Sequence, residues 1–335
     1  MECIYGIMDK KGTEDPGTQK KTGTTSDLLL TDCTAAWSSV RGSKGAKKNP
    51  VKENQDDFFI LNAASWHRTS VGPDLGVWQQ HVCRLLTQAF EEAQADLCEQ
   101  RGLKVETSGA TATVVLHWKG LQRIAVAHIG DSRAALGLGV CKPSRWNTEL
   151  SPDTRPVFQE LTEDHFPDTP KELQRLRVCR AKISPDGTRL LKKEEDEEDD
   201  EDQQTQMHSQ PQLHPQLVRT TSFSSGVWAS PRQNGVALSR SFGDTAFVSS
   251  GLSHVPDVAF HPAPPGSVLL LASDGVWQFM DLEASLQSIR VGLQGGVLQD
   301  ATNRLAAEAW TRWIRDPVMA PRKYIDDITL VTAIL

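Results

Sequence analysis

The feature that most restricts the fold of this chain is the grouping of its strand and helix patterns. Apolar side chains at helical spacing predict helices over three stretches, 75–97, 282–293 and 301–315. Alternating or continuous apolar runs predict strands at 57–61, 111–117, 123–129, 133–136, 267–272 and 328–335. Strands that come in runs, with helices between the runs, favour an α+β fold in which helices cover sheets.

Charge limits the partners that such a domain can have. The formal net charge is −7, and an unbroken run of nine acidic residues extends from Glu194 to Asp202. Without that run the balance is −7 + 9 = +2, which is close to neutral. A near-neutral domain offers no electrostatic footprint for nucleic acid or for a membrane surface. No apolar stretch approaches the roughly 20 residues that cross a bilayer. We therefore expect a monomer that binds neither nucleic acid nor membrane.

The cysteines indicate a reducing compartment. The chain has six, at positions 3, 33, 83, 98, 141 and 179, and none lies in a Cys-x-x-Cys pair or at zinc-ligand spacing from a histidine. The sequence also begins without a signal-peptide pattern. Reduced thiols in the cytoplasm or the nucleus are the expectation.

Composition divides the chain into three parts. Residues 1–49 are rich in Lys, Gly, Thr and Ser, and we expect most of them to form a flexible N-terminal leader. Residues 50–335 carry the strand and helix patterns of one domain. Within that domain, residues 192–217 combine the acidic run with a stretch rich in Gln, His and Pro. They contain too few apolar side chains to offset the entropy of ordering, so this insert is expected to be disordered.

Four aspartates lie where a predicted strand meets a turn. They are Asp56, Asp131, Asp274 and Asp326. Each one alone is more often a turn or cap residue than a ligand. Carboxylates at strand ends can nevertheless converge on one edge of a sheet, and a group of oxygen ligands suits Mg²⁺ or Mn²⁺.

The order of several short blocks resembles one family. The blocks are 108–113, 127–133, 161–165, 238–244, 256–258, 272–277 and 326–329, and they include Ile-Gly-Asp-Ser-Arg, Leu-Thr-Glu-Asp-His, Ser-Phe-Gly-Asp and Ser-Asp-Gly-Val-Trp. Together they extend from about Asn54 to Leu335 and resemble the metal-dependent (type 2C) protein serine/threonine phosphatases.

That resemblance implies a fold, a reaction and a set of ligands. The fold would be two antiparallel sheets packed face to face and flanked by helices. A metal-activated water would attack phosphoserine or phosphothreonine in a phosphoprotein at a site with two Mg²⁺ or Mn²⁺ ions and a possible third. By the resemblance, Asp274 and Asp326 would bind metal directly, Asp56 would bind through water, and Asp131 would help with the third ion.

The chain departs from the family pattern in two places. The segment between Leu61 and Val77 lacks the family's Asp-Gly-His-Gly-Gly motif, whose Asp bridges both metals, so one strand and part of a helix could be missing. In addition, Val51 stands where the family has a phosphate-binding arginine, which leaves Lys52 and Arg41 as weak candidates. We assign no residue as a general acid or base.

Three hypotheses follow from these departures. The chain is an active phosphatase, a pseudophosphatase that keeps the fold as a binding or regulatory module, or a splice form or gene model that lacks one catalytic segment. A separate regulatory hypothesis concerns Ser222. Arg219 lies three positions before it, which is a pattern that basic-directed kinases accept, although a plain Ser/Thr-rich linker is the simpler interpretation.

Overall fold

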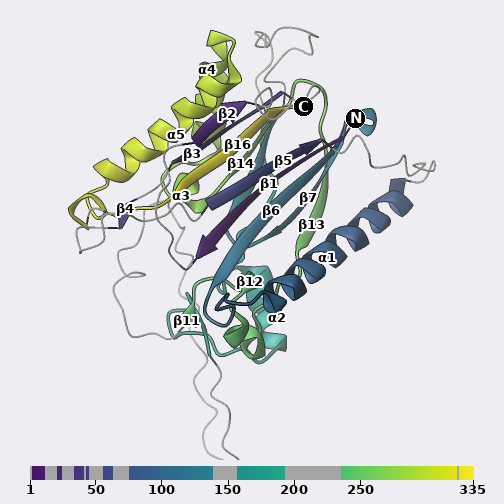
Figure 1. Cartoon of the computed structure of the whole chain (residues 1–335), viewed down its shortest axis with the longest axis vertical. Helices are drawn as coiled ribbons and strands as arrows, with labels where there is room; N and C mark the ends of the chain where they lie inside the picture. The colour runs from purple at the N-terminus through teal and green to yellow at the C-terminus, as the bar shows by residue number, and fades with distance from the viewer. Residues whose placement is uncertain are drawn as a thin grey trace, which may run out of the picture.

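Two antiparallel sheets packed face to face, with helices on both outer surfaces, form the molecule (Figure 1). The computed structural model describes residues 2–11, 21–24, 34–40, 43–44, 56–62, 75–138, 157–192, 235–322 and 324–335. The predicted α+β sandwich is confirmed.

The first sheet has six strands. In spatial order they are β13 (Asp257–Pro262), β7 (Arg123–Ile129), β6 (Gly109–Trp118), β1 (Glu2–Lys11) and β5 (Asp56–Asn62), with β12 (Phe242–Gly243) also paired to β6. The second sheet also has six strands: β2 (Lys21–Thr24), β3 (Thr34–Val40), β16 (Ile328–Ile334), β14 (Val268–Ala272), β8 (Arg133–Leu138) and β9 (Val157–Glu160). Two short pairs complete the strands, β10 (Leu190–Leu191) with β11 (Gly235–Val236) and β4 (Ser43–Lys44) with β15 (Tyr324–Ile325).

Strand β14 shows how the core is built, because it is buried on both faces. Leu269 and Leu271 point into the apolar layer between the sheets, where they pack with Val126 of β7. The alternate residues, including Leu270, pack under the outer helices α4 (Leu282–Gly292) and α5 (Leu298–Arg315). A strand covered on both faces reads as a continuous apolar run, which explains why the sequence predicts it correctly.

Helix α1 (Leu75–Glu99) covers the outer face of the first sheet (Figure 1). Its buried stripe runs along one side of the helix, through Trp78, Val82, Leu86, Phe90 and Gln94. The indole of Trp78 meets that of Trp118 edge to face, with ring centroids 4.8 Å apart. Two apolar side chains that the helical spacing placed on this stripe are not part of it, because Leu85 is 42% exposed and Ala89 is also exposed.

The N-terminal stretch differs from our expectation. We predicted a mostly flexible leader over 1–49, yet its described parts include β1 between β5 and β6, and β2 and β3 in the second sheet. The first sheet is therefore continuous where we had left open a missing strand. The reason is that a strand distant in sequence pairs with both neighbours, and a local pattern cannot reveal such a pairing.

Several predicted features lie outside the described residues. They include Arg41, Lys52, Ser222 and all of the insert 192–217 except Lys192. Among the helices that the structure describes, none is both long enough and apolar enough to span a bilayer.

Candidate metal centre

Strand pairing gathers the predicted aspartates at one end of the sandwich. In the second sheet, Ala272 at the end of β14 pairs with Arg133 at the start of β8 and with Leu330 near the start of β16. The loops that carry Asp131, Asp274 and Asp326 adjoin these three positions, so they emerge at the same end. The backbone of these three loops therefore lies at one end of the second sheet.

The loops of Asp274 and Asp326 are packed directly against each other. A Cβ atom added to Gly275 would lie 1.9 Å from the carbonyl oxygen of Asp327, so only glycine permits this approach. The Ser273 amide donates to the Thr329 carbonyl (3.0 Å), and the Thr329 amide donates to Ser273 Oγ (3.1 Å). The indole of Trp313 donates to the Gly275 carbonyl at 2.7 Å. These bonds fix the two aspartates relative to one another.

The hydroxyl of Tyr324 lies beside the Asp326 carboxylate, and its pKa shows the sign of the electrostatic potential there. This hydroxyl donates to Asp326 Oδ2 at 3.3 Å. Burial of the phenol raises its pKa above the ordinary range, and the negative charges of Asp326, Asp274 and Asp327 raise it further. Three carboxylates act on this one phenol, so the potential there is negative.

Asp131 lies on a turn that is locked onto the first sheet. Gly130 has φ +95°, and a Cβ there would lie 2.2 Å from Thr111 Cγ2. The hydroxyls of Thr111 and Ser132 are 2.8 Å apart, and Thr113 Oγ1 donates to the Ser132 carbonyl. The turn thus presents Asp131 at the junction between the two sheets. We call Asp131, Asp274, Asp326 and Asp327 the carboxylate cluster.

The donor set of the carboxylate cluster fits Mg²⁺ or Mn²⁺. It consists of carboxylate oxygens, which these hard cations prefer, and the negative potential at Tyr324 favours a cation. Asp274 and Asp326 are half-buried, so they keep access to solvent. Asp56 begins β5, directly opposite Asp9 of β1 in the strand register, which brings its backbone to the same end.

A second charged group next to this end was not predicted. Glu172 of α2 (Pro170–Val178) is 1% exposed and accepts from the Arg240 guanidinium at 2.5 and 3.0 Å. Arg175 and the Ser239 hydroxyl donate to its other oxygen. Arg240 also donates to Asp257 at 2.8 Å. We call Glu172, Arg175, Arg240 and Asp257 the arginine network.

The arginine network stabilises its carboxylates as anions. Burial would raise the pKa of Glu172, but the hydrogen bonds from Arg240, Arg175 and Ser239 lower it to about 2. Burial likewise opposes the ionised form of Asp257, whose pKa is nevertheless lowered by His165, Lys171 and Arg240. Because these charges are paired within the chain, loss of one partner would leave another charge buried and uncompensated.

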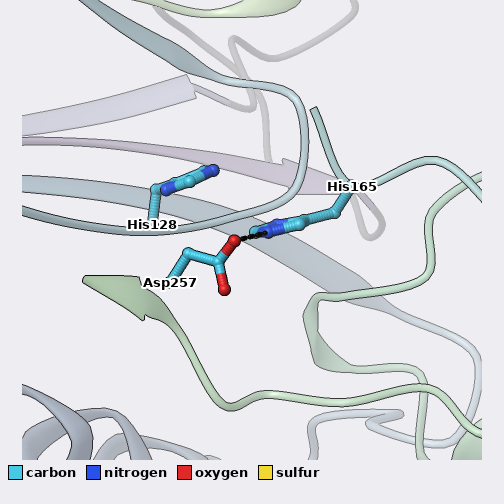
Figure 2. A group of neighbouring side chains, drawn as sticks. All are labelled: His128, His165 and Asp257. Atoms are coloured by element: carbon cyan, nitrogen blue, oxygen red, sulfur yellow. Dashed lines mark hydrogen bonds and ion pairs between the residues drawn. The ribbon is translucent and has the colours of Figure 1, made fainter. Parts of the chain in front are cut away.

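His128, His165 and Asp257 are close enough to resemble a metal site (Figure 2), but their hydrogen bonds argue against one. The Gly130 amide donates to His165 Nδ1 (3.0 Å), so the ring proton is on Nε2, which donates to Asp257 at 3.2 Å. Both nitrogens of His165 are therefore committed. His128 stacks on His165 and bonds to the Glu163 carbonyl at 2.8 Å. Burial and the neighbouring His165 lower the pKa of His128 to about 4.

A signal for the arginine network exists in the sequence. Arg240 lies inside the block 238–244, and Glu172 is the third residue of a short helix. A buried arginine requires a carboxylate partner, because an unpaired charge inside a protein is very unfavourable. Nothing local shows that Glu172, 68 positions away, is that partner.

Comparisons with known proteins agree with this arrangement. A family model described as Protein phosphatase 2C matches residues 62–317. "Probable protein phosphatase 2C 61" of Arabidopsis thaliana is 30% identical over 240 residues, covering 70% of this chain and 58% of the relative. "Probable protein phosphatase 2C 72" of the same plant is 27% identical, covering 68% of this chain and 54% of the relative. The chain spans less than two thirds of the length of either relative.

A solved structure shares the fold. The serine-threonine phosphatase 2C from Toxoplasma gondii matches with a TM-score of 0.56 and 17% identity, covering 98% of this chain and 94% of that one. The chain belongs to the protein phosphatase 2C family, whose members are metal-dependent hydrolases. The resemblance seen in the sequence blocks is confirmed.

Proposed function

We propose that this chain hydrolyses phosphoserine and phosphothreonine in proteins, with Mg²⁺ or Mn²⁺ bound by Asp56, Asp131, Asp274 and Asp326. The observation that carries the proposal is the close packing of the Asp274 and Asp326 loops, with Gly275 against the Asp327 carbonyl. Such packing holds two carboxylates in fixed positions, as metal binding requires. Membership in the family supports phosphoproteins as the substrate class.

Each side chain at this end has a task under the proposal. Bound Mg²⁺ or Mn²⁺ would make water more acidic and neutralise charge on the phosphoryl oxygens. Asp274 and Asp326 hold the cation, and the Tyr324 hydroxyl orients Asp326. The turn at Gly130 holds Asp131 in place for a further ion. Lys52 or Arg41 remains the proposed contact for the substrate phosphate, with Lys able to act only as a point charge.

The test compares two aspartate-to-asparagine variants. Asp274→Asn should lower the rate of phosphate release from a phosphothreonine peptide by about 10²- to 10³-fold, which is typical of losing one electrostatic element of a catalytic site. Asp281→Asn is the matched control. Asp281 caps α4 by accepting from the Ala284 amide at 2.7 Å, and asparagine caps equally well. Equal rates in both variants would remove Asp274 from the site.

The absence of the Asp-Gly-His-Gly-Gly motif favours a second candidate, a pseudophosphatase that uses the same fold for binding. A purified wild-type chain that binds phosphopeptide but releases no phosphate with either metal would support that candidate. We also propose a monomer in the cytoplasm or nucleus. Cys83, Cys98 and Cys179 are not in disulfides, which is consistent with such a compartment.

A further inference from the structure

Basic side chains are concentrated on α2 and on the hairpin that follows it. Residues 166–192 contain seven lysines and arginines but only three aspartates and glutamates, which is a local excess of +4 in a chain whose formal net charge is −7. Helix α2 lies at the lower end of the molecule, together with β11 and β12 (Figure 1). The question is which of these cations the fold itself uses.

Some of the cations already have partners within the chain. Lys171 contacts the Asp257 carboxylate, and Arg175 belongs to the arginine network. Three others are exposed, and within the described part of the chain no ion pair or side-chain hydrogen bond satisfies them: Arg177, Arg180 and Lys192. The fold therefore leaves these three cations available to an anion from elsewhere.

Backbone hydrogen bonds bring the three unpaired cations into one short stretch of surface. The Arg180 amide donates to the Arg177 carbonyl at 3.1 Å, in the turn that ends α2. The antiparallel register of the following hairpin places Lys192 opposite Ala181, the neighbour of Arg180. We call Arg177, Arg180 and Lys192 the basic surface.

Exposed apolar side chains lie next to the basic surface. Val178 is 82% exposed, the largest fraction for any large apolar residue that the structure describes. Val248 of η2 (Thr245–Ser250) is 51% exposed. The end of η2 packs on the end of α2, since a Cβ atom added to Gly251 would lie 3.5 Å from Cys179 Cβ. Arginines beside exposed apolar groups offer a partner both charge and contact area.

Hydrogen bonds also fix α2 to the end of the molecule that carries the carboxylate cluster. Arg175 donates to the Ser239 carbonyl at 2.9 Å, and the Ser239 amide donates to the His165 carbonyl at 2.9 Å. The ring of His165 in turn accepts from the Gly130 amide, next to Asp131. A partner bound to the basic surface is thus bound to the same connected part of the fold as the Asp131 turn.

We infer that the basic surface binds an acidic segment of the phosphoprotein substrate, so that the chain favours phosphorylation sites flanked by glutamate or aspartate. The inference rests on the proposed function, because it assigns a substrate preference to the same enzyme. Charge complementarity selects this occupant. Arginine matches a carboxylate with two parallel hydrogen bonds, and a local positive charge attracts an anionic chain over a distance.

The first test compares two phosphothreonine peptides whose flanks carry either glutamates or glutamines. Wild-type kcat/KM should be about 3- to 10-fold higher for the glutamate peptide, as two exposed charge pairs can supply. The difference should lie in KM, and it should shrink with added salt, which screens exposed charges. The double variant Arg177→Gln with Arg180→Asn should abolish the preference. Asparagine tolerates the left-handed backbone at position 180, where φ is +49°.

The matched control is the double variant Arg304→Gln with Arg315→Gln. Both arginines are exposed on α5, and Arg315, like Arg177, lies in the last turn of its helix. The control therefore removes the same net charge and a similar interaction with a helix dipole. It should keep the wild-type preference. Equal losses in the two double variants would overturn the inference, because net charge alone would then explain the preference.

Binding without catalysis separates this inference from the proposed function. A fluorescent peptide of glutamate and alanine should bind the metal-free, full-length chain, and the Arg177→Gln, Arg180→Asn variant should bind it at least about 3-fold more weakly by fluorescence anisotropy. A chain that shows this difference but releases no phosphate would overturn the proposed function and keep the basic surface. Equal hydrolysis of both peptides, with equal anisotropy in wild type and variant, would overturn the basic surface alone.

The competing occupant is the acidic run of the chain itself. Glu194–Asp202 begins two positions after Lys192 in the sequence. A variant with Glu→Gln and Asp→Asn at every position of 194–202 distinguishes the two occupants. The same preference for the glutamate peptide in this variant and in wild type would support a substrate segment. A preference that appears only in this variant would assign the surface to the acidic run and overturn the inference.

Discussion

The carboxylate cluster and the arginine network lie close together but have opposite electrostatic characters. In the cluster, burial and the charges of Asp326, Asp274 and Asp327 raise the pKa of the Tyr324 phenol. In the network, the arginines overcome the effect of burial and lower the pKa of Glu172 to about 2. The carboxylate cluster presents anions that favour the binding of a cation. In the arginine network, the carboxylates are already paired with arginines of the chain.

The two groups also differ in how their carboxylates are paired and exposed. Glu172 and Arg240 are almost fully buried, and their charges are satisfied within the chain. Asp274 and Asp326 remain half-buried, on loops whose backbone is fixed by neighbours. A fully paired carboxylate supports the structure, whereas a positioned and partly exposed one is available to a ligand.

The largest expected effect comes from breaking the arginine network. Glu172→Gln leaves the buried guanidinium of Arg240 with one anionic partner fewer. Removal of one partner from a buried ion pair typically costs about 3–5 kcal/mol, so the free energy of unfolding should fall by that amount. Urea denaturation followed by tryptophan fluorescence measures the loss.

An exposed ion pair provides the control for this measurement. Glu308 pairs with Arg312 at 2.8 Å, and both side chains are more than a third exposed. Glu308→Gln should change the free energy of unfolding by no more than about 0.5 kcal/mol, as expected for a surface pair. Similar losses in Glu172→Gln and Glu308→Gln would show that burial of the network contributes nothing.

The next largest effect is a loss of stability in mild acid. His128, which faces His165, Asp257, Arg240 and the Glu163 carbonyl, has a folded pKa of about 4 against an ordinary 6.5. Between these values the unfolded chain binds more protons, so stability is complete above pH 6.5 and falls as the pH drops toward 4. A shift of this size corresponds to about 3 kcal/mol.

His117 is the natural comparison for this titration. Burial, together with the charge of Lys119, also lowers its pKa to about 4, so it should add a similar loss over the same pH window. His128→Asn should therefore remove about half of the acid-induced loss, measured by urea denaturation at a series of pH values. If wild type and His128→Asn lose the same free energy of unfolding in acid, the pKa of His128 is not lowered in the folded protein.

The features that could be predicted from the sequence are those whose signal lies in a short stretch of residues. Residues 268–272 are apolar on both faces, and the aspartates Asp131 and Asp274 adjoin strands, so both features can be read from short windows. The arginine network and β1 depend on pairings between distant segments. The run Ile-Tyr-Gly-Ile-Met at 4–8 is a possible strand signal, but only its pairing with β5 and β6 gives it a place. Local composition alone favoured a flexible leader there.

The smallest expected effect has the opposite sign to that of Glu172→Gln. In metal-free protein, Asp274→Asn removes one negative charge from a group of like charges, which near a protein surface is worth on the order of 1 kcal/mol. The same change loses a favourable charge at the first turn of α3 (Asp274–Trp277), but that helix has four residues and a correspondingly small dipole. Asp274→Asn should therefore unfold at slightly higher urea than wild type without metal and lose this advantage when Mn²⁺ is added. A lower urea midpoint in metal-free Asp274→Asn would mean that Asp274, like Glu172, is paired for stability, and the contrast between the two groups would fail.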